Sequence, residues 1–135
     1  MAPKHRVRID GSHFSTLEGF FQHFAAEALD HQWGQNLDAF NDVLRGGFGT
    51  PEVGFVIEWV NHNVSRQSLG YPETVRQLQL RLERCHPSNI PRIQQELAAA
   101  QRDEGPTAYD WLIEIIRDHC PGGSEEEDGI ELVLN

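Results

Sequence analysis

The chain has 135 residues and a formal net charge of −10, from 21 acidic side chains against 11 lysines and arginines. This length suits one domain with a core of its own, and the acidic balance argues against nucleic acid as a partner because phosphates must be neutralised by basic side chains. With only two cysteines, no signal-peptide pattern and no apolar stretch long enough to span a membrane, the sequence predicts a soluble cytoplasmic protein.

The first predicted elements along the chain are a short strand and a helix. Arg6–Asp10 places Val7 and Ile9 on one side, which is typical of a half-buried strand. Ser15 and Glu18 have the spacing of a capping box and predict the start of a helix. The apolar positions of this helix recur at helical spacing and predict an aromatic side that faces the core: Leu17, Phe20, Phe21, Phe24, Ala25 and Ala28.

The second predicted helix is short and follows a loop at residues 31–35. Asn36 is a suitable N-cap, and the glycines at Gly46 and Gly47 predict its end. One side of the helix is apolar and is expected to pack on the core: Leu37, Phe40, Val43 and Leu44.

Two carboxylates, Asp38 and Asp42, share the other side of this helix. Residues four apart differ by only about 40° around a helix axis, so the two acids and Asn41 form one stripe next to Trp33 of the preceding loop. Like charges at this spacing repel each other, and the helix dipole offsets that cost for Asp38 in the first turn but not for Asp42. The pair therefore indicates a surface for a cationic partner, and Asp42 is its most informative residue.

The rest of the chain predicts two more strands with helices between them. Val53–Val60 is a nearly continuous apolar run, typical of a buried parallel strand, in which Glu58 must lie near the end or find a partner. The stretch 61–106 is mostly helical, Thr107–Asp110 predicts the capped start of a further helix, and Ile130–Leu134 predicts the last strand. The connections are long enough for parallel crossovers, so we expect a single α/β domain with a small parallel sheet.

Metal and cofactor binding are weakly indicated. Cys85-His86 and His119-Cys120 offer ligand types that zinc accepts, but neither pair has a spacing that would aim both side chains at one ion. The acidic run Glu125–Asp128 is interpreted as a solvated loop. The sequence therefore predicts no cofactor and no metal site.

The segment Trp33–Ala39, with Asp42 at the following offset, resembles the barstar family, whose members are bacterial intracellular inhibitors of secreted ribonucleases such as barnase. Further matching segments are Ile9–Gly11, Ile57–Trp59 and the closing Gly129–Leu134 strand. The resemblance implies a small three-stranded parallel sheet packed with helices.

This resemblance covers residues 5–60 and 107–135. The stretch between them, about 61–106, is far longer than the corresponding connection in barstar, so we interpret it as a helical insertion within a single barstar-like domain of residues 1–135.

In the family, the helix after the matching loop enters the ribonuclease active site, where its carboxylates take the place of substrate phosphate. The resemblance implies that Asp42 occupies the phosphate pocket with Asp38 beside it. At Asn41 the chain departs from the family, which has an aromatic residue on the binding helix.

The remaining expected partner-binding residues also come from the resemblance. Gln32 and Trp33 are expected to form a loop platform, and Gly34 to allow close backbone approach. Asp118 is expected to supply a charge at the rim, and Phe48 to stand where the family has an exposed tryptophan.

The function expected from these features is inhibition of a basic, barnase-like ribonuclease by an antitoxin-like protein that has no catalysis of its own. Two alternatives remain open. Asp38 and Asp42 could bind a divalent cation in a small hydrolase, although the sequence offers no further acid at an obvious spacing. The chain could instead be a barstar-like interaction module with a different basic protein as its target.

Overall fold

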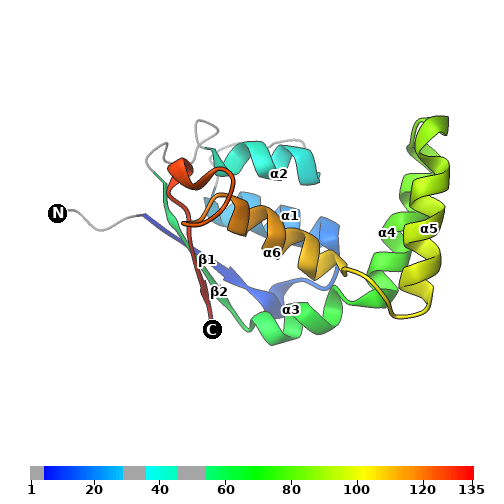
Figure 1. The fold of residues 1–135 in the computed structure, drawn as a ribbon. Helices are drawn as coiled ribbons and strands as arrows, with labels where there is room; N and C mark the ends of the chain where they lie inside the picture. The colour runs from blue at the N-terminus through cyan, green and yellow to red at the C-terminus, as the bar shows by residue number, and fades with distance from the viewer. Residues whose placement is uncertain (1–4, 29–35, 46–53) are drawn as a thin grey trace.

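The computed structural model describes residues 5–28, 36–45 and 54–135. Its elements, in chain order, are β1 Arg6–Asp10, the 3₁₀ turn Gly11–His13, α1 Leu17–Ala28, α2 Leu37–Leu44, β2 Val56–Val60, α3 His62–Ser68, α4 Tyr71–Arg84, the 3₁₀ turn Pro87–Asn89, α5 Ile90–Gln101, α6 Ala108–Asp118, the 3₁₀ turn Glu126–Asp128 and β3 Glu131–Leu134. Helices α1, α2 and α6 lie on one side of the small sheet, and the α4–α5 hairpin stands apart from it (Figure 1).

The three strands form one parallel sheet in the order β1-β2-β3. In the central strand, Ile57 is in register with Val7 of β1 and with Leu132 of β3. Ile57 and Trp59 are completely buried on one face, whereas Glu58 and Val60 on the other face are only partly buried, so the strand is not covered equally on both faces as its continuous apolar pattern predicted. The predicted α/β fold with a three-stranded parallel sheet is confirmed.

The start of the central strand differs from the prediction. The apolar run was expected to be extended from Val53, which lies outside the described residues, but β2 begins at Val56. Gly54 has a φ of 91°, and a Cβ there would come within 2.3 Å of the carbonyl oxygen of Gly129. The strand begins later because this close crossing of two chain segments requires a left-handed glycine. As predicted, Glu58 finds partners, with Asn135 Nδ2 at 3.0 Å and Arg6 at 3.6 Å.

The predicted capping box at the start of α1 is wrong. Thr16 caps the helix instead, because its Oγ1 accepts a hydrogen bond from Gly19 N at 3.0 Å. Glu18 does not fold back but is bound by Arg76 and Gln77 of α4. By contrast, the capping box predicted at Thr107–Asp110 is present at the start of α6.

Among the described residues, the buried apolar side chains fall into two groups. The larger one fills the space around the sheet and includes the rings of Phe20, Phe24 and Phe40. The smaller one lies in the α4–α5 hairpin and is built around Leu78, Ile93 and Ala100. The half-buried Trp111 of α6 contacts both groups, so it links the hairpin to the rest of the molecule.

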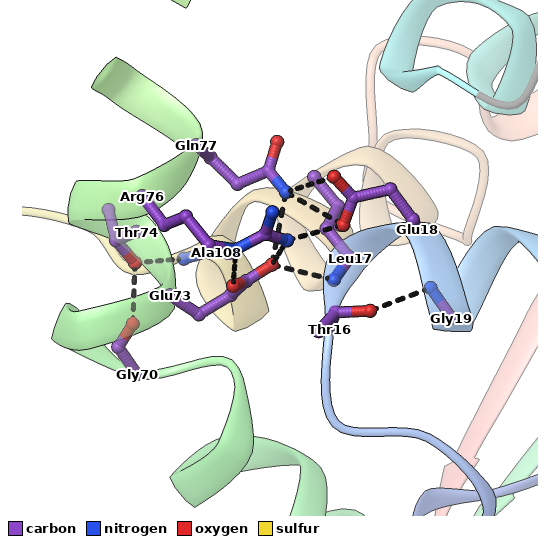
Figure 2. Close-up of polar contacts among 10 residues, drawn as sticks. All are labelled: Thr16, Leu17, Glu18, Gly19, Gly70, Glu73, Thr74, Arg76, Gln77 and Ala108. Atoms are coloured by element: carbon purple, nitrogen blue, oxygen red, sulfur yellow. Dashed lines mark hydrogen bonds and ion pairs between the residues drawn. The ribbon is translucent and has the colours of Figure 1, made fainter. Parts of the chain in front are cut away.

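Polar contacts fasten the base of α4 to the starts of two other helices (Figure 2). Glu73, only 6% exposed, accepts a hydrogen bond from Leu17 N at 2.8 Å and is bound by Arg76 and Gln77. Thr74 Oγ1 accepts from Ala108 N at 2.7 Å. The bonds from Leu17 N and Ala108 N each satisfy a backbone N–H that a helix start leaves without an intrahelical partner.

Candidate protein-binding site

The short helix α2 presents the two predicted carboxylates on a firmly held backbone. Asn36 caps it as predicted, with Oδ1 accepting from Ala39 N at 2.8 Å. The apolar side is buried, with Phe40 0% and Val43 2% exposed, whereas Asp38 and Asp42 are exposed on the opposite side. Burying the apolar stripe in the core fixes the direction in which the acids point.

The two acids differ in their surroundings. The side chain of Asp38 makes no hydrogen bond or ion pair with any other residue that the structure describes. Asp42 accepts a hydrogen bond from Arg45 Nη1 at 2.8 Å, although its side chain remains 54% exposed. Arg45 is held at the same time by Glu125, with Nε–Oε1 2.9 Å and Nη2–Oε1 2.8 Å.

The hydrogen bonds to Glu125 raise the pKa of Arg45, and the nearby charges of Glu125 and Asp42 act in the same direction. Arg45 therefore stays charged and bridges α2 to the acidic run 125–128. This run was expected to be a solvated loop, but the tertiary structure places Glu125 next to α2, in contact with Arg45. No signal in the sequence pairs residues that are so far apart along the chain.

A completely buried histidine joins the same two segments. His119 Nε2 lies 2.6 Å from Asn41 Oδ1, and His119 Nδ1 lies 2.6 Å from Asp128 Oδ2. Asn41 was predicted as a partner-facing residue. The structure gives it a further role, because its half-buried side chain ties α2 to the end of α6 and to the loop after it.

Three of these groups could also hold a metal ion. The ligand atoms of His119, Glu125 and Asp128 lie within 4.8 Å of one another, and this is the cluster of potential metal ligands found in the described part of the chain. It does not include Asp38, the acid that the magnesium-hydrolase alternative requires together with Asp42. The short contacts of His119 with Asp128 and Asn41 account for the cluster as a hydrogen-bonded junction.

Of the other predicted site residues, Asp118 is the last residue of α6. It lines a groove of ≈ 880 Å³ together with Arg117 and Glu131. Within the described segments it shares no hydrogen bond or ion pair with α2. Gln32, Trp33, Gly34 and Phe48 lie outside the described residues.

Comparison with known proteins identifies a family for the greater part of the chain. The family model described as "Barstar (barnase inhibitor)" matches residues 4–85, which include the first two strands and helices α1 to α4. No curated protein matches the chain. No helix in the described segments is long and apolar enough to cross a membrane.

Proposed function

The chain belongs to the barstar family, and from this premise we propose that it is a cytoplasmic inhibitor protein, not an enzyme, that blocks the basic active site of a ribonuclease. The observation that carries the proposal is the exposed pair Asp38 and Asp42 on a helix whose opposite side is anchored in the core. A helix held in this way can present two negative charges at a fixed spacing, as a phosphate backbone does.

The inhibition would use electrostatics without chemistry. An acidic face attracts a basic active site over a long range and speeds the encounter, and charge pairs that lose their water in the complex slow dissociation. These general rules were themselves illustrated with the barnase–barstar complex, so here they describe how the family is known to bind and are not an independent result. In this chain, a cationic side chain of the enzyme would compete with Arg45 for Asp42. Arg45 can release that carboxylate and remain paired with Glu125.

The surrounding residues would complete the surface. We assign Gln32, Trp33 and Gly34 to the loop beside α2, Phe48 to the segment after it, and Asp118 to the rim. Asn41 would act from the edge of the surface, because its oxygen is engaged by His119.

The test is an inhibition assay with purified barnase and other basic ribonucleases, in which RNA cleavage is followed as the protein is added. We expect stoichiometric inhibition of at least one of these enzymes, and Asp42→Ala should weaken it. Glu104→Ala is a matched control because Glu104 is also exposed and is also paired with an arginine, Arg102, at 3.4 Å. Inhibition that is as strong in Asp42→Ala as in the wild type would exclude the proposed mode of binding.

A second candidate function is a barstar-like interaction module with another basic protein as its target. The α4–α5 hairpin favours it, because this hairpin and the start of α2 line a common groove, which places further surface for a partner beside Asp38. A basic partner that is not a ribonuclease, and that is lost when Asp38 and Asp42 are both replaced by alanine, would establish it.

A further inference from the structure

A groove of ≈ 670 Å³ separates the start of α2 from the α4–α5 hairpin. One wall carries Asp38 of the acidic pair, and the other wall carries three arginines of the hairpin: Arg81, Arg84 and Arg92. The hairpin stands upright next to α2, and its tip reaches beyond that helix (Figure 1). A protein that covered the acidic face of α2 would therefore meet the hairpin as well.

The arginines of this wall are poorly neutralised. Arg81 lies over the ring of Trp111, 4.4 Å from its centroid, and burial lowers its pKa. Neither Arg81 nor Arg84 has an ion pair with any residue that the structure describes, and Arg92 has only a 3.4 Å contact with Glu96. A partly desolvated guanidinium without a carboxylate in contact gains free energy when an anion arrives.

The carboxylates of the opposite wall do not cancel this charge. Glu18 of α1 is already bound by Arg76 and Gln77 of α4 (Figure 2). Glu96 of α5 and, more weakly, Asp38 raise the pKa of Arg81 through space, but neither forms an ion pair with it, and burial keeps this pKa below its ordinary value. The groove is thus a cationic strip directly beside an acidic helix, in a chain whose net charge is −10.

The groove is also held in shape before any partner arrives. The base of α4 is fastened to α1 by the buried Glu73 (Figure 2). The hairpin is joined to α6 through Trp111. A preformed site avoids the entropic cost of ordering itself on binding.

We propose that this groove is a second docking site, which receives an acidic segment of the same protein that binds α2; the inference rests on the proposed function. A nucleic acid fits less well, because the net charge of the chain and Asp38 at the groove wall repel a chain of phosphates. A carboxylate-bearing loop on a basic protein avoids this repulsion, since the basic region next to it is attracted by Asp38 and Asp42. Neighbouring patches of opposite sign also fix the register of the partner and disfavour wrong partners.

The chemistry of the groove can be tested without any ribonuclease. Nuclear magnetic resonance of the arginine side-chain N–H groups, during titration with a short polyglutamate peptide at low salt, should show shifts for Arg81 and Arg84. The double variant Arg84→Glu, Arg92→Glu should abolish binding. Arg102→Glu is the control, because Arg102 is on the far end of the hairpin and has a 3.4 Å ion pair like that of Arg92.

The inference would be overturned if the Arg81 and Arg84 signals did not shift, or if Arg102→Glu lost as much peptide binding as the double variant. So would tighter binding of an oligouridylate of the same length, which would identify the groove as a nucleic-acid site.

The same variants, measured against the inhibited ribonuclease, test the partner. The double variant should weaken binding by about tenfold, mainly through faster dissociation because contacts inside the groove are lost, while Arg102→Glu changes it little. If Asp42→Ala weakens inhibition and the double variant does not, the groove assignment is wrong and the inhibitor function stands. If the peptide binds in the groove but no ribonuclease is inhibited, the proposed function is wrong. The groove then still binds acidic segments, but its partner is not a ribonuclease.

Discussion

Two groups of carboxylates, one at the junction of α1 with α4 and one on α2, have similar composition and opposite roles. Glu73 is buried, and its oxygens are taken by a backbone N–H, a guanidinium and an amide. Asp38 and Asp42 are exposed, and one of them has no partner in the described structure. A buried acid with all its hydrogen bonds made is committed to the fold, whereas an exposed acid on a rigid helix is available to a partner.

The largest effect that tests this comparison is expected at Asp42. Asp42→Ala should weaken ribonuclease binding by at least about 2 kcal/mol, as the loss of a charged hot spot does. It should change the free energy of unfolding by less than about 0.5 kcal/mol, because the side chain is exposed. Inhibition titrations and urea unfolding measure the two quantities. A variant with weakened binding and equally weakened stability would show that Asp42 belongs to the fold.

Glu73→Ala should show the reverse. Removing this buried carboxylate leaves Leu17 N–H without its acceptor and leaves Arg76 and Gln77 with Glu18 alone, at a cost of about 2 kcal/mol in the free energy of unfolding. Urea unfolding measures it, and inhibition per folded molecule should fall much less than in Asp42→Ala, because Glu73 does not lie on the acidic face of α2. Glu83→Ala, at an exposed position of the same helix, is the control and should change stability little.

His119→Ala tests whether the buried junction supports the acidic face. The substitution removes the partner of Asn41 and Asp128 and leaves a small cavity, so a loss of about 1 to 2 kcal/mol in the free energy of unfolding is expected. Hydrogen exchange should speed up in the 125–128 turn and in α2. Unchanged exchange in both segments would show that His119 does not couple them.

The smallest effect is the pH dependence that the α1–α4 junction contributes. Burial raises the pKa of Glu73, but hydrogen bonds from Arg76, Leu17 N–H and Gln77 outweigh it, so the pKa lies below its ordinary value in the folded chain. The stability that this lowering provides is therefore complete above the unfolded pKa of about 4.3 and is lost as the pH falls through the folded value. Urea unfolding at several pH values should show the wild type approaching Glu73→Gln on acidification. A constant difference between the two would contradict the assignment.

Local patterns predicted the elements that depend on neighbouring residues. The strand at Arg6–Asp10, the N-cap at Asn36 and the capping box at Thr107–Asp110 are all present, because each is formed by residues within one turn or one strand. The capping box at Ser15 failed because a remote helix offered Glu18 a better partner, Arg76. Local rules cannot anticipate such competition.

By itself, the sequence determined the α/β fold, its three strands and the acidic stripe of α2, since hydrophobic periodicity and helix geometry are short-range properties of the chain. Only the tertiary structure decided which distant charges meet. It placed Glu125 on Arg45 and the buried His119 against Asn41, and it set three arginines of the hairpin across a groove from Asp38. These contacts depend on how helices pack in three dimensions, and the spacing of residues along the chain carries no information about them.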